Sequence, residues 1–254
     1  MFSITDIHKP QILAVEKDFL LVYKPPRMHS APLAKSNNGE TLLHWCVMEF
    51  PEIADLPGRK KGEGGLLHRL DYETQGLVLL ARNTLGMESL LEQQREGKIL
   101  KEYGAMSTKS EVLLPGFPPF PNPYPPTPIQ SAFRPYGPGR KAVRPVLVDK
   151  SDGKEQKAIY TTEILESNVT DEGFISFRLR ILKGFRHQIR AHLAWFGLPI
   201  LNDTLYGGMS YGDGLLALRA CSLSFADPSS GEKRVYSIPY PLLPTPHSLI
   251  SAAR

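Results

Sequence analysis

The sequence predicts an α+β fold with a bent, largely antiparallel or mixed β-sheet flanked by helices and loops. Short apolar stretches with strand periodicity outnumber the helical segments and follow one another in adjacent pairs. Of the 254 residues, 41% are hydrophobic and 22% are charged, which is normal for a globular protein with a buried core. Because no internal repeat or sharp composition shift divides the chain, a single domain is expected over residues 1–254.

The N-terminal half is expected to contain four strands and two helices. Strands are expected at residues 12–15, 19–23, 77–81 and 99–106, each bounded by polar or turn residues. Thr41 is placed to cap a helix that runs to about Phe50, and Asn83 or Thr84 to cap a second helix that ends at Gly97.

The C-terminal half is expected to be richer in strands. Residues 158–166 and 174–182 should pair around the turn near Asp171, and the second of these alternates apolar side chains with Ser176, Arg178 and Arg180. Residues 187–196 predict a helix with Gly197 at its C-terminal cap. Short strands are expected near residues 215–219, 222–225 and 234–238.

Proline is unusually frequent in one segment. Eleven of the 23 prolines lie between Pro115 and Pro145, so this segment is predicted to be neither regular helix nor central strand. It is interpreted as an extended, polyproline-II-rich insertion over residues 115–145 with a basic patch. Two explanations stay open, a long surface loop and a loop that touches RNA phosphates. The patch contains Arg134, Arg140, Lys141 and Arg144.

The composition excludes several classes of protein. No apolar run reaches the roughly 18 residues that a membrane helix needs, and no secretory signal begins the chain. Two cysteines, Cys46 and Cys221, without a CxxC pair predict neither a disulfide framework nor a cysteine zinc site. We therefore expect a cytoplasmic protein, without membrane contact and monomeric by default. The net charge of +4 permits a polyanionic partner without proving one.

One candidate for chemistry is Asp71, which lies in a polar segment directly before the apolar run 77–81. A carboxylate that is partly desolvated yet kept charged by a cation suits a nucleophile or a base. A structural arginine–aspartate pair in the same turn explains the residues equally well.

A second candidate segment runs from Leu182 to Leu193. On a helix, Arg186 and Arg190 share a face, and cations near a helix start oppose its dipole, so a phosphate or carboxylate partner would explain them. His187 and His192 are five residues apart and do not form the same-face zinc pair. His192 is expected to be a partly buried histidine with satisfied hydrogen bonds.

Taken together, these segments resemble the RluA-type family of pseudouridine synthases. The family pattern H-R-L-D-x-x-T-S-G-L-L-L-L-A is matched by His68 to Asp71, Thr74 and Gly76 to Ala81. The later pattern G-R-T-H-Q-I-R-x-H-L-x-x-x-G-x-P-I-x-x-D-x-x-Y-G is matched by Gly184, His187 to Arg190, His192-Leu193, Gly197, Pro199-Ile200, Asp203 and Tyr206-Gly207. Tyr23-Lys24-Pro25, Lys101-Glu102-Tyr103 and Leu218-Arg219-Ala220 resemble shorter family segments in the same order.

Three positions depart from the family pattern. Gln75 replaces the usual serine, Phe185-Arg186 replaces Arg-Thr, and Arg219 replaces a common histidine. These departures put the choice of substrate in doubt more than the chemistry.

The resemblance implies an RNA pseudouridine synthase built on a single catalytic domain, acting on rRNA or tRNA without cofactor or metal. In that reaction the N-glycosidic bond of a uridine breaks, the uracil rotates, and a C–C bond forms at C5. Asp71 would be the catalytic carboxylate, attacking base or sugar or removing a proton. Arg190 would be its salt-bridge partner, and Tyr103 would stack on the base or assist proton removal at C5.

The resemblance also implies RNA-binding residues. An extra N-terminal S4 module is not expected, because only about ten residues precede the first family-like strand. Substrate-binding positions would be His68, Arg69, Thr74, His187, Gln188 and Leu218. Candidate phosphate contacts are Lys24, Arg134, Arg140, Lys141, Lys183 and Arg186.

Three alternatives are weighed against this function. A catalytically silent RNA-binding protein on the same scaffold would lose the carboxylate function. A hydrolase would use Asp71 or Glu73 to activate water, but no metal cluster, GxSxG or paired-carboxylate motif supports it. A proline-motif docking role for residues 115–128 would add to the enzyme rather than replace it.

Overall fold

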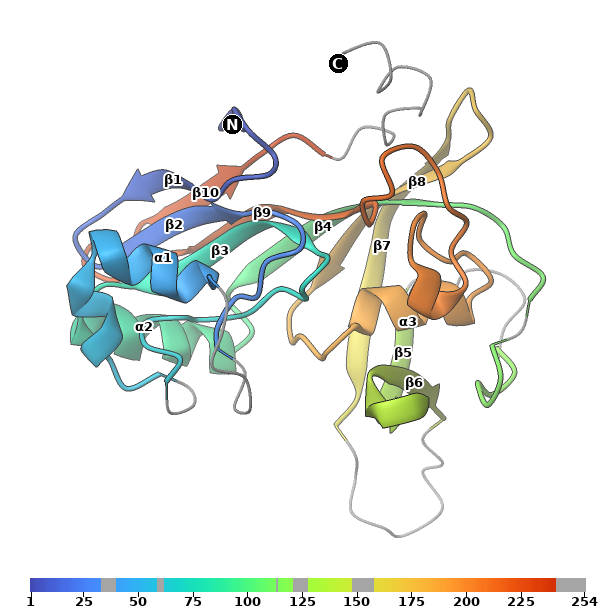
Figure 1. Ribbon diagram of the computed structural model, residues 1–254. Coiled ribbons are helices and arrows are strands. Elements are labelled where there is room, and N and C mark those ends of the chain that lie inside the picture. The colour runs from blue at the N-terminus through green and yellow to red at the C-terminus, as the bar shows by residue number, and fades with distance from the viewer. Residues whose placement is uncertain (33–39, 59–61, 113, 121–127, 148–157, 241–254) are drawn as a thin grey trace, which may run out of the picture. The chain divides into compact units, whose positions relative to one another are not determined.

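The computed structural model describes residues 1–32, 40–58, 62–112, 114–120, 128–147 and 158–240. This part of the chain folds as two compact units, whose elements are labelled in Figure 1. Unit 1 comprises residues 1–102 and 219–240, and unit 2 comprises residues 103–218. The α+β prediction is confirmed, and the single domain over residues 1–254 remains a prediction beside this division.

Unit 1 contains a mixed sheet in the order β1, β2, β3, β9, β10. All neighbours are antiparallel except β3 and β9, which run parallel and pair Gln75 with Arg219 and Gly76 with Ala220. Gly76 has a φ of +127°, and a Cβ on it would lie 2.3 Å from the Ala220 carbonyl oxygen, so only glycine permits this pairing. The strands are β1 (Gln11–Val15), β2 (Phe19–Lys24), β3 (Gln75–Ala81), β9 (Leu218–Ala226) and β10 (Lys233–Ser237).

Two helices of unit 1 begin where the sequence predicts. The Thr41 side chain accepts a hydrogen bond from the His44 N–H at the start of α1 (Leu42–Glu49), and Asn83 caps α2 (Thr84–Arg95) in the same way. Every residue of β2 and β3 is buried, so both faces of these strands are covered. Met87 and Leu90 of α2 belong to the same apolar core as alternate residues of β2 and β3.

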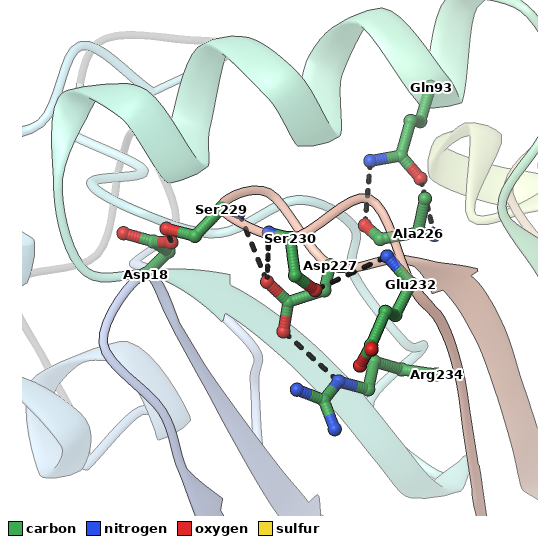
Figure 2. Close-up of polar contacts among 8 residues, drawn as sticks. All are labelled: Asp18, Gln93, Ala226, Asp227, Ser229, Ser230, Glu232 and Arg234. Carbon is green, nitrogen blue, oxygen red and sulfur yellow. Dashed lines mark hydrogen bonds and ion pairs between the residues drawn. The ribbon is translucent and has the colours of Figure 1, made fainter.

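The turn between β9 and β10 is held by polar contacts on both sides (Figure 2). The Asp227 carboxylate accepts the backbone N–H groups of Ser229 at 3.0 Å and Ser230 at 3.1 Å, and Arg234 donates its Nε to the other oxygen at 3.0 Å. The Gln93 side chain accepts from the Ala226 N–H and donates to the Ala226 carbonyl, both at 2.8 Å. The end of β9 is thereby tied to α2.

Unit 2 contains the strands β4 (Leu100–Ser107), β5 (Ile129–Tyr136), β6 (Ala142–Val146), β7 (Tyr160–Val169) and β8 (Ile175–Ile181). β4 begins in unit 1 and continues in unit 2, where the order is β4, β8, β7, β5, β6. The helix α3 (Gln188–Trp195) packs against β6 and β7 (Figure 1). The alternation predicted for β8 is confirmed, since Phe177, Leu179 and Ile181 are buried while Arg178 and Arg180 are partly exposed.

The structure corrects the prediction for the proline-rich segment. Residues 129–136 and 142–146 form an antiparallel hairpin, and β5 lies between β6 and β7. The prolines are tolerated because β7 pairs only with residues 129–131 of β5, which leaves Pro135 on a stretch with one strand neighbour. Pro145 lies on β6, at the edge of the sheet of unit 2. Residues 121–127 of the predicted insertion lie outside the described residues.

Two smaller corrections concern element boundaries. The short strands expected at 215–219 and 222–225 are one strand, β9, because no turn separates them. The helix expected from residue 187 begins at Gln188, since His187 has a φ of +54° in the left-handed region. No helix in the described ranges is long and apolar enough to span a membrane.

Candidate functional site

The backbone around Asp71 is fixed on both sides. The Ser30 hydroxyl donates to the Leu70 carbonyl and accepts from the Leu70 N–H, both at 3.0 Å. The Asp71 carbonyl accepts from the Thr74 N–H at 3.1 Å and closes a tight turn before β3. Asp71 is partly exposed, whereas Leu70 and Thr74 are buried. The carboxylate therefore stands on a short loop whose two ends are anchored in the core of unit 1.

A buried lysine holds this loop through hydrogen bonds to backbone carbonyl groups. Lys24 has no exposed surface, and its Nζ donates to the carbonyl oxygens of Pro25 and Met28 at 2.8 Å and of Tyr72 at 3.3 Å. Burial lowers the pKa of Lys24 to about 7, while the negative charges of Asp71 and Glu73 oppose that shift. The prediction of a phosphate contact at Lys24 is wrong, because its ammonium is enclosed and holds the Asp71 loop instead.

The cations beside the loop pair with other carboxylates. Arg69 forms its ion pair with Glu63 (Nη1 to Oε1, 3.1 Å), so the structural arginine–aspartate pair considered for this turn is not formed by Arg69. Arg27 lies 3.7 Å from Glu73. The ring of His29 lies against the partly exposed Tyr72, with centroids 4.7 Å apart. The sequence analysis did not single out Arg27, His29 or Tyr72. Arg27 and His29 lie outside the matched motifs, and Tyr72 occupies a variable position within the first one.

Two predicted substrate-binding residues of unit 1 are buried. His68 accepts a hydrogen bond at Nε2 from the Leu79 N–H at 3.2 Å, which places the proton of a neutral ring on Nδ1 and ties the residue to β3. Thr74 is 2% exposed, and its Oγ1 has no hydrogen-bond partner within the described part of the chain. A buried hydroxyl without a partner is unfavourable, so Thr74 is a candidate for a contact with a bound molecule.

Two of the three departures from the family pattern contact each other. Arg219 donates from Nε at 3.3 Å and Nη2 at 3.0 Å to Oε1 of Gln75, and the Tyr23 hydroxyl donates to the same oxygen at 2.7 Å. Burial raises the pKa of Tyr23 to about 12, so its hydroxyl stays a donor. Gln75 and Arg219 therefore form one polar cluster next to the Asp71 loop rather than two separate changes.

In unit 2, Arg190 has a buried carboxylate partner. Its Nε lies 2.7 Å from Oδ2 of Asp203 and its Nη2 lies 2.8 Å from Oδ1, a bidentate pair. The two side chains are 7% and 0% exposed. The guanidinium also lies over the ring of Tyr206, 5.3 Å from the centroid. The prediction that a carboxylate or phosphate explains a cation at the start of α3 is confirmed for Arg190. Asp203 and Tyr206 belong to the second family pattern, which was the available signal for them.

Two predicted substrate-binding residues at the start of α3 form hydrogen bonds with other residues of unit 2. Gln188 donates to the Thr161 carbonyl at 2.8 Å and accepts from the Phe185 N–H at 3.0 Å, and it is almost fully buried. His187 lies 3.1 Å from the Tyr206 hydroxyl through Nδ1. Arg186 precedes the helix, so it does not share a helical face with Arg190.

His192 behaves as a core residue. It lies between the Ser131 hydroxyl at 2.9 Å and the Thr162 hydroxyl at 2.8 Å, and it has no exposed surface. Burial lowers its pKa to about 3. The expectation of a histidine with satisfied hydrogen bonds is confirmed, although the burial is complete rather than partial. Within the described ranges, no group of three or more His, Cys, Asp or Glu side chains could hold a metal ion.

The remaining predicted residues are distributed over both units. Tyr103 is 6% exposed on β4, and Leu218 is 3% exposed. Asp71 belongs to unit 1, whereas Tyr103 and Arg190 belong to unit 2, so an Asp71–Arg190 salt bridge stays a prediction. Lys183 is exposed and lies over the ring of Tyr160, 5.5 Å from its centroid.

Comparison with known proteins gives a consistent result. Residues 18–195 match a family model described as RNA pseudouridylate synthase. The chain is 28% identical over 211 residues to ribosomal large subunit pseudouridine synthase D of Buchnera aphidicola, covering 81% of this chain and 58% of that protein. It is 29% identical over 202 residues to the protein of the same name from Haemophilus ducreyi, covering 78% and 52%. The chain thus spans little more than half the length of these two relatives.

A solved structure supports the fold. The chain resembles human RNA pseudouridylate synthase domain containing 1 with a TM-score of 0.62 and 21% sequence identity, over 98% of this chain and 96% of that one.

Proposed function

Because this chain belongs to the RNA pseudouridylate synthase family, we propose that it isomerises specific uridines of rRNA or tRNA to pseudouridine, with Asp71 as the catalytic residue. The family match over residues 18–195 carries this proposal, since it includes the Asp71 loop, Tyr103 and Arg190. The two relatives from Buchnera and Haemophilus are named for the large ribosomal subunit, which favours rRNA as the first substrate to test.

The reaction balances without a further reagent. The bond from the ribose C1′ to N1 of uracil breaks, the base turns, and C1′ bonds to C5. The proton that C5 loses is matched by the proton that N1 gains, and no oxidant, reductant or leaving group is needed. We therefore propose that the enzyme works without cofactor or metal and needs from its side chains only a placed carboxylate and a way to move one proton.

The geometry of unit 1 supports Asp71 in this role. The loop is anchored at Leu70, Tyr72 and Thr74, so the carboxylate would meet the nucleotide in a fixed position. Lys24 holds the segment on the other side of Asp71, because its Nζ donates to the carbonyl oxygens of Met28 and Tyr72. Thr74 ends the same tight turn that begins at Asp71, and its hydroxyl is proposed to bind the substrate.

Unit 2 supplies the other proposed residues. Arg190 is held by Asp203 through Nε and Nη2, which fixes the plane of the guanidinium. We keep as proposals the two roles that the family resemblance implies, the salt bridge of Arg190 with Asp71 and the stacking of Tyr103 on the target base.

The test is release of tritium from C5-labelled uridine in unmodified RNA, with rRNA and tRNA transcripts assayed separately and with EDTA added. Wild type is compared with Asp71→Asn and with Glu73→Gln, a matched loss of a neighbouring carboxylate that pairs with Arg27. We expect release by wild type and Glu73→Gln, none by Asp71→Asn, and no effect of EDTA. All three proteins should be folded at the assay temperature, which their melting curves would show.

Two results would contradict the proposal. Full release by Asp71→Asn would remove Asp71 from the chemistry. RNA binding by wild type with no release from either pool would favour the silent RNA-binding protein on the same scaffold.

A further inference from the structure

The hairpin β5–β6 carries a concentration of positive charge. We call residues 128–147 the basic hairpin. It contains four cations, Arg134, Arg140, Lys141 and Arg144, and its sequence has no aspartate or glutamate. Arg134, Arg140 and Lys141 are exposed, and Arg144 is half-buried.

Two of these cations face each other directly. Arg134 and Arg144 are cross-strand partners in the register of β5 and β6, so their side chains leave the same face of the hairpin side by side. Like charges in this position are destabilising. A sequence under selection for stability alone would place an acidic or neutral residue at one of the two positions. The pair is therefore better explained by a bound group with negative charge.

No carboxylate in the described ranges pairs with any cation of the basic hairpin. Arg144 donates from Nη1 to the Gly116 carbonyl, which is neutral. Arg186 donates from Nη2 to the carbonyls of Arg140 at 2.9 Å and Ala142 at 3.0 Å, and so adds a further cation at the tip. By contrast, Arg95 and Lys98 of unit 1 each lie beside a glutamate, Glu92 and Glu96 respectively.

The other face of the hairpin is firmly anchored. Phe133 and Val143 are buried in one apolar cluster with Ala191 and Ala194 of α3. The Tyr206 hydroxyl accepts from the Val143 N–H at 2.9 Å and lies 3.1 Å from the Val143 carbonyl, while the Tyr206 ring packs against Arg190. The charged face therefore belongs to a strand pair whose other face is packed in the core of unit 2, and Tyr206 contacts both this pair and Arg190.

We propose that the basic hairpin is an RNA-docking surface, which binds backbone phosphates of the substrate and holds it beside α3. This inference rests on the proposed function for the identity of the polyanion. Phosphate contacts position a nucleic acid without reading its sequence, and arginine is well suited to them. Arg134 and Lys141 are the first candidates for these contacts, because both are exposed and neither forms an ion pair with a carboxylate among the described residues.

The experiment measures binding of a fluorescent single-stranded uridine 20-mer as a function of salt. The test variant is Arg134→Gln/Lys141→Gln. The matched control is Arg95→Gln/Lys98→Gln, which removes the same charge from cations that lie beside glutamates. If both test residues contact phosphates, the slope of log K against log salt should flatten by about 1.4, and affinity at 0.1 M salt should fall roughly 25-fold. The control should keep the wild-type slope within error.

Stability gives a second readout. The test variant should melt at the wild-type temperature or above it, because Arg134→Gln relieves the repulsion with Arg144. Equal weakening of RNA binding in both double variants, or an unchanged slope in the test variant, would overturn the docking surface. Absence of tritium release by wild type would instead refute the synthase, while the comparison of the two slopes would still decide whether the hairpin binds RNA.

Discussion

Asp203→Asn removes the negative charge that holds the guanidinium of Arg190 inside unit 2. The substitution keeps the shape of the side chain, so it changes charge with little change in packing. Arg190 would then be a buried cation, 7% exposed, with an amide oxygen in place of a carboxylate. Breaking a buried ion pair by removing one partner destabilises by about 3–5 kcal/mol.

The lower end of that range applies here. The asparagine oxygen can still accept from one of the two donors, Nε or Nη2, and the Tyr206 ring still packs against the guanidinium. We expect a loss of about 3 kcal/mol in the free energy of unfolding, which is a large share of the roughly 5–15 kcal/mol that stabilise a typical protein. With a urea m-value of about 3 kcal/mol/M, the midpoint should fall by about 1 M.

Urea denaturation followed by circular dichroism measures this effect. Asp171→Asn, at an exposed turn of unit 2, is the matched control and should stay within about 0.5 kcal/mol of wild type. The double variant Arg190→Met/Asp203→Leu should be less destabilised than Asp203→Asn, because apolar side chains then replace both charges of the buried pair. A midpoint for Asp203→Asn equal to that of the control would refute the reasoning.

Three further predictions concern buried polar groups. Folded Lys24 gives up its proton near pH 7 and the unfolded residue near 10.5, so the unfolded state binds more protons between these values. The free energy of unfolding of wild type should therefore rise between pH 7 and 10 relative to that of Lys24→Met. Parallel stability curves of the two proteins in urea titrations would contradict this. Burial lowers the pKa of His192 from 6.5 to about 3, so below pH 6.5 the unfolded state binds more protons. Wild type should therefore lose stability relative to His192→Gln as the pH drops below 6.5. Equal acid sensitivity of the two proteins would contradict this prediction. Gln75→Ser leaves Tyr23 and Arg219 without their shared acceptor and should lower the free energy of unfolding by about 1–3 kcal/mol. Adding Arg219→His should recover part of this loss. If the effects of the two substitutions simply add in the same urea assay, the residues do not form one cluster.

Local patterns predicted much of the fold. The caps at Thr41 and Asn83 and the alternation in β8 are set by residues within a few positions of one another, so they are visible in the sequence. The hairpin at residues 129–146 was missed because proline frequency was interpreted without its pairing partners. Whether Pro135 is acceptable depends on where β7 stops pairing, which is a tertiary fact.

For the candidate site too, the sequence identifies individual residues but not their contacts with distant parts of the chain. The motifs identify Asp71 and Arg190, but they do not show that Arg190 is held by Asp203, thirteen residues further along the chain. Lys24 was interpreted as a surface cation, because its burial depends on carbonyl groups of the separate segments around Met28 and Tyr72. The link between Gln75 and Arg219 joins residues 144 positions apart, a distance at which a single sequence carries no spacing signal.

The parallel pairing of β3 with β9 in unit 1 also affects how the chain folds during synthesis. β3 emerges from the ribosome long before its partner, since Gln75 pairs with Arg219, 144 residues later. At a synthesis rate of about 5–20 residues per second, one edge of β3 stays unpaired for roughly 7–30 seconds until β9 has been made. All residues of unit 2 described here come from the uninterrupted stretch 103–218 and are synthesised within that interval. The unit that begins the chain should therefore be the last to complete its sheet, and an apolar strand edge stays open to non-native pairing in the meantime.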